Sequence, residues 1–173
     1  MGLDLDFNAL VEEVNNTYAD HTGERLIERM DTAGIDFPAF CAVDNSSLRG
    51  NTYQVAKSLN QTVASIAQAF LDRFMAFAGI DPRRPESPDL LKLCLEEFGM
   101  KGLKLHPDHG YYPNSPEAYR MLEILQHYKR ILLTHTGPGA LLDKAGKYAH
   151  PLLLDEVAVD FPDMTIIVAH MGQ

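Results

Sequence analysis

The sequence predicts an α/β protein: a partial TIM (β/α)8 barrel of about five parallel strands with flanking helices. Short runs of strand-forming apolar residues alternate with amphipathic helical stretches, which is the pattern of a parallel sheet covered by helices. No glycine-rich phosphate-binding fingerprint follows a strand, and this disfavours an open nucleotide-binding sheet. Polar side chains capable of chemistry stand at the ends of three separate strands, which is where the functional rim of a barrel lies.

The N-terminal part of the chain is expected to form two helices before the first strand. The apolar spacing of residues 7–18 predicts the first helix. The second, over 24–34, is expected to be capped by Thr22 and to stop at Gly34, because glycine readily adopts the left-handed conformation that ends helices. The first strand is then expected over 35–43.

Four further helix and strand pairs follow in alternation. The helices are expected over 52–71, 89–98, 116–128 and 152–161, and the strands over 73–80, 101–106, 131–135 and 165–169. Ser115 is the expected cap of the third of these helices, with Pro116 in its first position, and Pro151 is expected to open the last. In the loop between these two, residues 140–146 are expected to form a helical turn.

The whole chain, 1–173, is expected to be a single domain, because no linker composition interrupts it. A closed barrel needs eight strands in about 250 residues. The chain is therefore expected to be short of a full barrel by three strands.

Composition excludes several classes of partner. The net charge of −9 disfavours binding to nucleic acid or to an anionic membrane surface. No apolar run approaches the roughly 18 residues of a membrane span, and the N-terminus lacks the basic stretch of a secretory signal. Cys41 and Cys94 lie in apolar contexts typical of reduced packing residues. A cytoplasmic protein that acts on a small molecule is expected.

Two histidines occupy matching positions at strand ends. His135 follows the run ILLT and His170 follows TIIVA, and each is followed within two residues by glycine. If alternate residues of both strands point into the barrel, the two imidazoles converge near its rim. Neutral imidazole is the commonest protein ligand for a catalytic divalent metal. The alternative, a hydrogen-bonded structural histidine at each strand end, explains the repetition less well.

Lys104 and His106 share one face of the preceding strand. A lysine in an apolar strand is costly unless it is paired or used, so Lys104 could bind a substrate carboxylate or, once carbamylated, bridge two metals. The alternative is that its ammonium reaches the rim and pairs with an acid. His106 is expected to face the substrate. In the loop that follows, His109, Tyr111 and Tyr112 could contact the substrate, or the tyrosines could be surface anchors.

Three segments carry a resemblance to a known family: GMKGLKLHP (99–107), ILLTHTG (131–137) and YAHPLLLDEVAVDFPDMTIIVAHMG (148–172), with weaker support from 28–36 and 74–85. In these segments the chain resembles the amidohydrolase-related proteins of the metal-dependent amidohydrolase superfamily. That branch includes enzymes similar to aminocarboxymuconate-semialdehyde decarboxylase. The resemblance implies that the visible strands are the second to the sixth of a (β/α)8 barrel.

The resemblance also implies roles for individual residues. His135 would be the metal ligand on strand five, and His170 would act as an acid or base or bind a second metal. Lys104 lies on strand four, where dinuclear relatives carry a carbamylated lysine. The implied function is that of a metal-dependent hydrolase or non-oxidative decarboxylase acting on a small carboxylate, amide or lactone through a metal-activated water. The implied metal is zinc, with manganese as the alternative.

Two features of the family pattern are missing from the sequence. The H-x-H pair of the first strand occurs nowhere in it, and neither does the eighth strand with its metal-binding aspartate. The chain is therefore expected to be a fragment of a longer enzyme, inactive alone, with open sheet edges that could drive homo-oligomer formation. The competing hypotheses are a metal-free scaffold or binding protein, and a dinuclear hydrolase with carbamylated Lys104.

Overall fold

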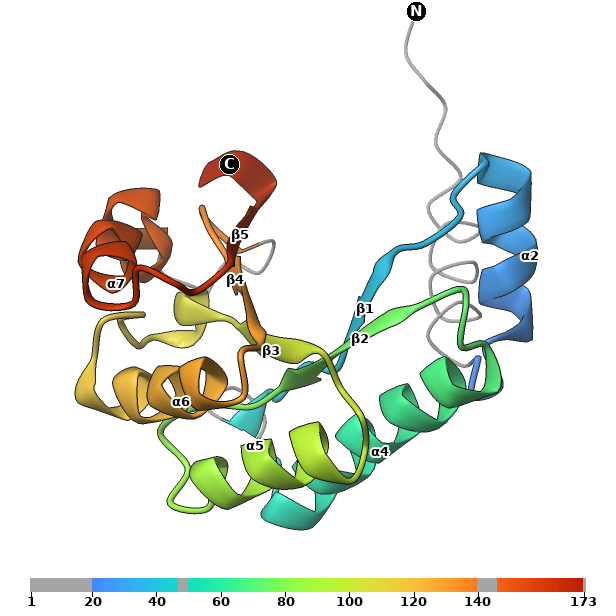
Figure 1. The fold of residues 1–173 in the computed structure, drawn as a ribbon, viewed down its shortest axis with the longest axis horizontal. Coiled ribbons are helices and arrows are strands. Elements are labelled where there is room, and N and C mark those ends of the chain that lie inside the picture. The colour runs from blue at the N-terminus through green and yellow to red at the C-terminus, as the bar shows by residue number, and fades with distance from the viewer. Residues whose placement is uncertain (1–19, 47–49, 140–145, 173) are drawn as a thin grey trace, which may run out of the picture.

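The computed structural model describes residues 20–46, 50–139 and 146–172. Within them five strands form one parallel sheet in the order β1-β2-β3-β4-β5, each strand pairing with the next along the chain. The strands are β1 (Ala39–Cys41), β2 (Met75–Gly79), β3 (Gly102–Leu105), β4 (Ile131–His135) and β5 (Ile166–Ala169). A curved parallel sheet in strictly sequential order is part of a barrel wall, so the predicted partial barrel is confirmed (Figure 1).

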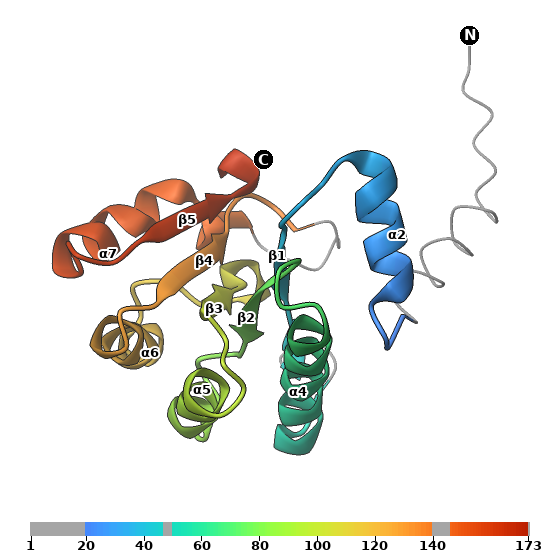
Figure 2. The same ribbon diagram turned by 45° about the vertical axis from the view of Figure 1, so that its right-hand side comes forward.

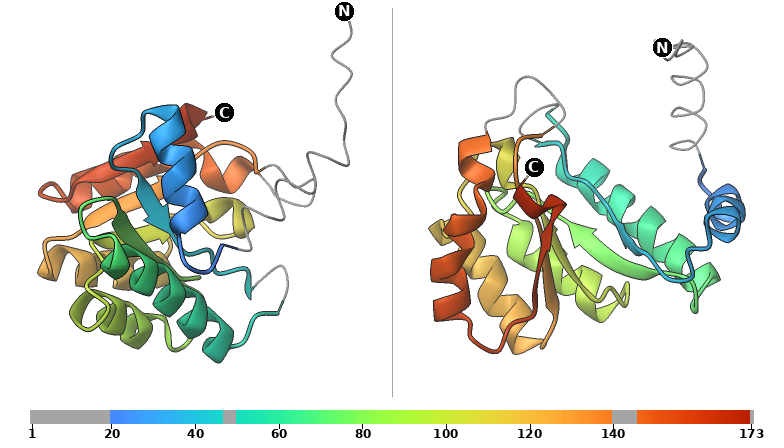
Figure 3. Two further views of the ribbon diagram at one scale, coloured as in Figure 1. Left: turned by 90° about the vertical axis from the view of Figure 1, so that its right-hand side faces the viewer. Right: turned by 90° about the horizontal axis from the view of Figure 1, so that it is seen from above.

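Helices cover the convex outer face of this sheet (Figure 2). They are α4 (Tyr53–Ala69), α5 (Ser87–Glu96), α6 (Pro116–His127) and α7 (Leu154–Asp160). Helix α2 (Glu24–Ala33) stands apart from them, beyond β1 at one edge of the sheet (Figure 3). Short 3-10 turns complete the description: η1 (Pro107–His109), η2 (Gly146–Ala149), η3 (Pro151–Leu153) and η4 (His170–Gly172). No helix in the described ranges is both long and apolar enough to cross a membrane.

Alternation along the strands separates a helix-facing side of the sheet from an inner side. On β3, Leu103 and Leu105 are fully buried in the hydrophobic cluster shared with the helices, and Leu132 of β4 joins them. Lys104 lies between these two leucines in the sequence and pairs in register with Leu133 of β4. The pleat thus directs Lys104 away from the helices and towards the inside of the barrel wall.

The predicted helix ends are correct in most places. Thr52 and Ser115 accept hydrogen bonds at the starts of α4 and α6, and Gly34 ends α2 with φ of 67°. Gly23, not the predicted Thr22, occupies the N-cap position of α2, with φ of 84°, although the hydroxyl of Thr22 still accepts the N–H of Glu24 at 3.4 Å. The carboxylate of Asp20 accepts two further N–H groups at this end, those of Gly23 and Leu26, each at 2.9 Å.

Other boundaries differ at the edges of the sheet. The strand predicted over 35–43 is reduced to β1, and Ile35 and Phe37 are 47% and 50% exposed, because an edge strand has a partner on one side only. Pro151 opens the turn η3, and α7 begins only at Leu154. The predicted helix 7–18 and most of the predicted turn 140–146 lie outside the described residues.

Asn60 joins helix α4 to strand β2. Its fully buried amide donates to the carbonyl of Gly79 at 3.0 Å and accepts from the N–H of Gly79 at 2.9 Å. Only glycine fits there, because a Cβ on Gly79 would lie 1.9 Å from the carbonyl oxygen of Ala42. The side chain of Asn60 thus bonds both polar backbone groups of Gly79, the last residue of β2, in place of backbone partners.

Replacing Asn60 with leucine is expected to lower the free energy of unfolding by about 2–4 kcal/mol, because both polar groups of Gly79 would be left buried and unsatisfied. Urea denaturation measures the change. Gln61→Leu is the matched control: its side chain is exposed on the same helix, and less than about 0.5 kcal/mol is expected. Equal effects from the two substitutions would contradict this account.

Candidate functional site

Three histidines line up at the C-terminal rim of the sheet. His106 follows β3, His135 is the last residue of β4, and His170 follows β5. The ring centroids of His106 and His135 are 5.4 Å apart, and those of His135 and His170 are 4.6 Å apart. The parallel pairing of the three strands therefore brings together side chains that are far apart in the sequence.

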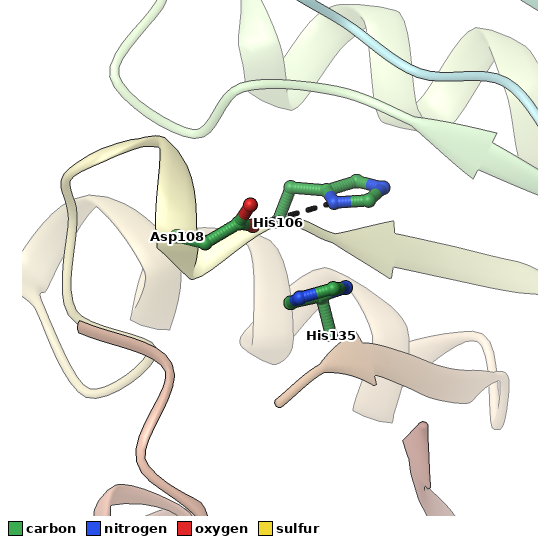
Figure 4. A group of neighbouring side chains, drawn as sticks. All are labelled: His106, Asp108 and His135. Carbon is green, nitrogen blue, oxygen red and sulfur yellow. Dashed lines mark ion pairs between the residues drawn. The ribbon is translucent and has the colours of Figure 1, made fainter. Parts of the chain in front are cut away.

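Asp108 joins this row although the sequence analysis did not single it out. The turn η1 begins directly after His106 and carries Asp108 back towards it, with 3.4 Å between Nδ1 of His106 and Oδ1 of Asp108. One ligand atom each from His106, Asp108 and His135 lie within 4.8 Å of one another (Figure 4). The H-x-D spacing at a strand end was the available signal, but it becomes informative only once the turn is known.

This donor set suits a divalent metal. Two imidazoles and one carboxylate are the ligands of many catalytic metal sites that keep an open position. Nε2 of His106 is buried and makes no hydrogen bond to any residue that the structure describes. A buried polar atom without a partner is unusual in a native fold and is compatible with a ligand that binds there.

Lys104 lies beside the histidines on the inner side of β3. Lys104 is 4% exposed, and its Nζ makes no hydrogen bond within the described ranges. Burial lowers the pKa of Lys104, and its interactions with the thiol of Cys41 and the carboxyl group of Asp108 partly oppose this shift. The alternative in which the ammonium reaches solvent at the rim does not match this burial.

A small cavity opens beside Lys104. Its volume is about 10 Å³, enough for about one water or one ion. It is lined by Asp44, Asp81, Lys104, His106, His109 and Tyr111, together with Ile80. His109 and Tyr111, which the sequence placed in a candidate substrate loop, are buried here, whereas Tyr112 is 42% exposed.

Two carboxylate–arginine pairs stiffen this rim, and the sequence analysis missed both. Arg84 binds Asp44 at 2.6 Å, and Arg83 binds Asp81 at 2.7 Å. Arg83 also donates to the carbonyl of His109 at 3.2 Å. These contacts tie the loops after β1, β2 and β3 to one another.

Tyr111 also stabilises the loop after β3. The guanidinium of Arg83 lies over the ring of Tyr111, 5.2 Å from the ring centroid. The hydroxyl oxygen of Tyr111 accepts the backbone N–H of His106 at 2.8 Å. The backbone position of His106 is therefore set by contacts that extend from the loop after β2.

The pair formed by Asp81 and Arg83 predicts an acid-dependent loss of stability. Burial alone would raise the pKa of Asp81, but the hydrogen bonds and charge of Arg83 outweigh it and bring the pKa below 3.8. A carboxyl group whose pKa is lower in the folded state than in the unfolded state stabilises the fold. This stabilisation is fully present above the unfolded-state pKa of 3.8, and it is lost as the pH falls through the lower folded-state pKa.

We therefore expect the wild-type protein to lose stability more steeply below pH 3.8 than Asp81→Asn does, since the amide does not titrate there. Urea denaturation at a series of acid pH values measures both slopes. Parallel curves for the two proteins would show that Asp81 does not carry this dependence.

Thr136 fixes the turn that presents His170. The backbones of His170 and Met171 are left-handed, with φ of 67° and 51°. The hydroxyl of Thr136 donates to the carbonyl of Ala169 at 2.6 Å and accepts the N–H of Gly172 at 3.0 Å. The exposed side chain of His170 is thus held next to His135 by Thr136, a buried residue that directly follows β4.

The sequence matches a protein-family model described as Amidohydrolase over residues 14–173. A comparison with curated protein sequences gives no match. Comparison with solved structures finds 5-carboxyvanillate decarboxylase from Novosphingobium aromaticivorans, complexed with manganese and 4-hydroxy-3-methoxy-5-nitrobenzoic acid. It is 26% identical with a TM-score of 0.71, and the match covers 87% of this chain and 50% of the decarboxylase.

Two more distant structures share the fold. A putative amidohydrolase from Staphylococcus aureus is 15% identical with a TM-score of 0.70, over 96% of this chain and 64% of the other. The 4-oxalomesaconate hydratase from Rhodopseudomonas palustris is 20% identical with a TM-score of 0.61, over 84% and 47%. The present chain thus spans about half to two-thirds of the length of these proteins.

Proposed function

Because the chain belongs to the amidohydrolase family, we propose that the protein carrying it is a divalent-metal-dependent enzyme that removes the carboxylate of a small organic substrate without oxidation. Two facts support this reaction. The carboxyvanillate decarboxylase with bound manganese is similar to 87% of the chain. The observation that carries the proposal is the buried ammonium of Lys104 next to His106 and His135, where a substrate carboxylate would be its counter-ion.

The residues of the rim would divide the work. His135 would hold the metal, either manganese or zinc, and the bound metal would supply positive charge that polarises the substrate. Lys104 would bind and orient the carboxylate. When the bond to the carboxylate carbon breaks, the electron pair stays on the substrate carbon and a proton must replace CO2 there. His170, exposed at the rim beside His135, is the proposed donor of that proton.

A hydrolytic reaction at two metals is the second candidate. It is favoured by one observation, the lowered pKa of buried Lys104, because only a neutral amine can react with CO2 to form a bridging carbamate. The metal content of the active protein separates the two mechanisms. One metal per chain would support the decarboxylase, and two would support the dinuclear hydrolase.

The test uses the complete reading frame that contains this sequence, since the chain spans half the length of the similar decarboxylase. The protein is loaded with Mn²⁺ or Zn²⁺ and given hydroxybenzoates, lactones and amides, and release of CO2 or of hydrolysis products is followed. We expect CO2 from a carboxylated substrate, and its loss in His135→Ala together with loss of bound metal. A protein that binds no metal and converts none of these compounds would support the scaffold hypothesis instead.

A further inference from the structure

We propose that a groove at the end of the sheet opposite the three histidines binds a small organic monocarboxylate, with Arg130 and Lys129 as the cations that receive it. The groove lies where β4 and β5 begin, beside the ends of α6 and α7 (Figure 2). Its volume is about 500 Å³, within the range of small-molecule sites. The site is independent of the proposed function, because the parallel strands begin here and end at the rim.

The guanidinium of Arg130 is the unusual feature of this groove. Arg130 is half-buried, and its Nε is buried without a hydrogen bond to any residue that the structure describes. The other half-buried arginines of the described ranges, Arg73 and Arg84, each bind a carboxylate at 2.6 Å. Removing a guanidinium N–H from water without an acceptor costs free energy, so Arg130 indicates a site for an anion from outside the fold.

The end of α6 does not supply the acceptor. Backbone carbonyls at a helix C-terminus are the natural partners of a nearby arginine, but here backbone N–H groups already bind them. The N–H of Lys129 donates to the carbonyl of Gln126 at 3.0 Å. The next N–H, that of Arg130, donates to the carbonyl of Leu125 at 2.9 Å. The backbone thus closes the turn by itself and leaves the guanidinium for another partner.

Lys129 adds a second cation at the cost of backbone strain. Its φ is 51°, in the left-handed region that glycine usually occupies after a helix. The exposed Lys129 lines the groove beside Arg130, and the acidic residue of the lining is Asp163. A chain with a net charge of −9 therefore places an excess of positive charge on this groove. Strain of this kind, retained where glycine would relieve it, supports a binding role for the lysine.

The lining also indicates the class of anion. Ile131 and Met164 provide apolar walls, and the groove is much larger than an inorganic ion needs, which favours an organic body. The carboxylate of Asp163 would repel a second negative charge, which favours a monocarboxylate over a phosphate ester. The lining contains no histidine, cysteine or serine, so the groove binds its ligand without transforming it.

The test is an NMR titration of the isotope-labelled 173-residue chain with benzoate, in which the Nε–H signal of Arg130 is followed. The signal is assigned by its absence from Arg130→Met, and we expect benzoate to shift it until the site is saturated. Calorimetry should show at least about tenfold weaker binding to Arg130→Met, because the variant loses a charge-assisted hydrogen bond. The matched control is Arg120→Met, which removes an exposed arginine of α6 and should bind as the wild type does.

Two further measurements test the class of anion. Asp163→Asn should bind benzoate more tightly, because a like charge is removed. Inorganic phosphate should bind more weakly than benzoate, because it cannot contact the apolar walls. Tighter binding of phosphate, or weaker binding of benzoate to Asp163→Asn, would overturn the assignment to a monocarboxylate.

The site itself falls if benzoate leaves the Arg130 signal unchanged, or if Arg130→Met and Arg120→Met lose the same affinity. Circular dichroism checks that both variants fold. Benzoate bound at the rim, as the proposed function implies, would be lost in Lys104→Met and would not shift the Arg130 signal. The groove and the proposed function can therefore each fail without the other.

Discussion

Replacing Arg84 with methionine is expected to lower the free energy of unfolding by about 3–5 kcal/mol. The side chains of Arg84 and Asp44 are 11% and 1% exposed, and two hydrogen bonds join them, at 2.6 and 3.0 Å. Arg84 also donates to the carbonyl of Asn51. Methionine preserves most of the buried stem but leaves the carboxylate of Asp44 in the interior without its cation, and the backbone N–H groups of Ser46 and Asp81 that remain bound to it cannot supply the lost charge.

Urea denaturation of the single and double variants measures this effect. Asp44→Asn combined with Arg84→Met should be less destabilised than the sum of the two single changes, because the pair is removed together. Arg73→Met is the matched control: its partner Asp31 is 60% exposed at a similar distance of 2.6 Å, so a loss of no more than about 1 kcal/mol is expected. Similar losses for Arg84→Met and Arg73→Met would show that the burial of the first pair has no energetic consequence.

The sequence predicts the features of this fold that depend on local periodicity. The order of the strands and the positions of His135 and His170 follow from apolar runs that end at a histidine, and a parallel sheet places all such ends at one rim. The caps at Thr52 and Ser115 are also local, because each side chain bonds to a backbone N–H three residues ahead. Features of this kind need no knowledge of tertiary contacts.

The features that the sequence could not predict depend on contacts between distant residues. Arg84 and Asp44 are separated by 40 positions, and nothing in the DPRRP segment specifies which acid each arginine meets. Asp108 becomes part of the site only because a 3-10 turn follows β3 directly. The shortening of β1 likewise reflects the lack of a second neighbouring strand among the described residues, which no property of its own residues reveals.

Lys104→Met is expected to have opposite effects on stability and on the proposed activity. The ammonium is buried without a hydrogen bond among the described residues, so replacing it with an apolar side chain of similar length should raise the free energy of unfolding by about 1–3 kcal/mol. In the complete enzyme the same change should raise KM for the carboxylate substrate about 10–100-fold, because a charge-assisted hydrogen bond contributes about 1.5–3 kcal/mol. Urea denaturation and steady-state kinetics measure the two effects.

The combination of effects distinguishes a binding residue from a structural one. Replacing a lysine that supports the fold would lower the free energy of unfolding. Replacing a lysine that serves only to bind a ligand would raise it, because such a residue is retained for binding at the expense of stability. Lys101→Met is the matched control, since Lys101 precedes the same strand but is exposed, and neither stability nor KM should change much. A Lys104→Met protein that is more stable and keeps its KM would show that a cation other than Lys104 binds the substrate carboxylate. One that is less stable would show that the ammonium supports the barrel wall itself.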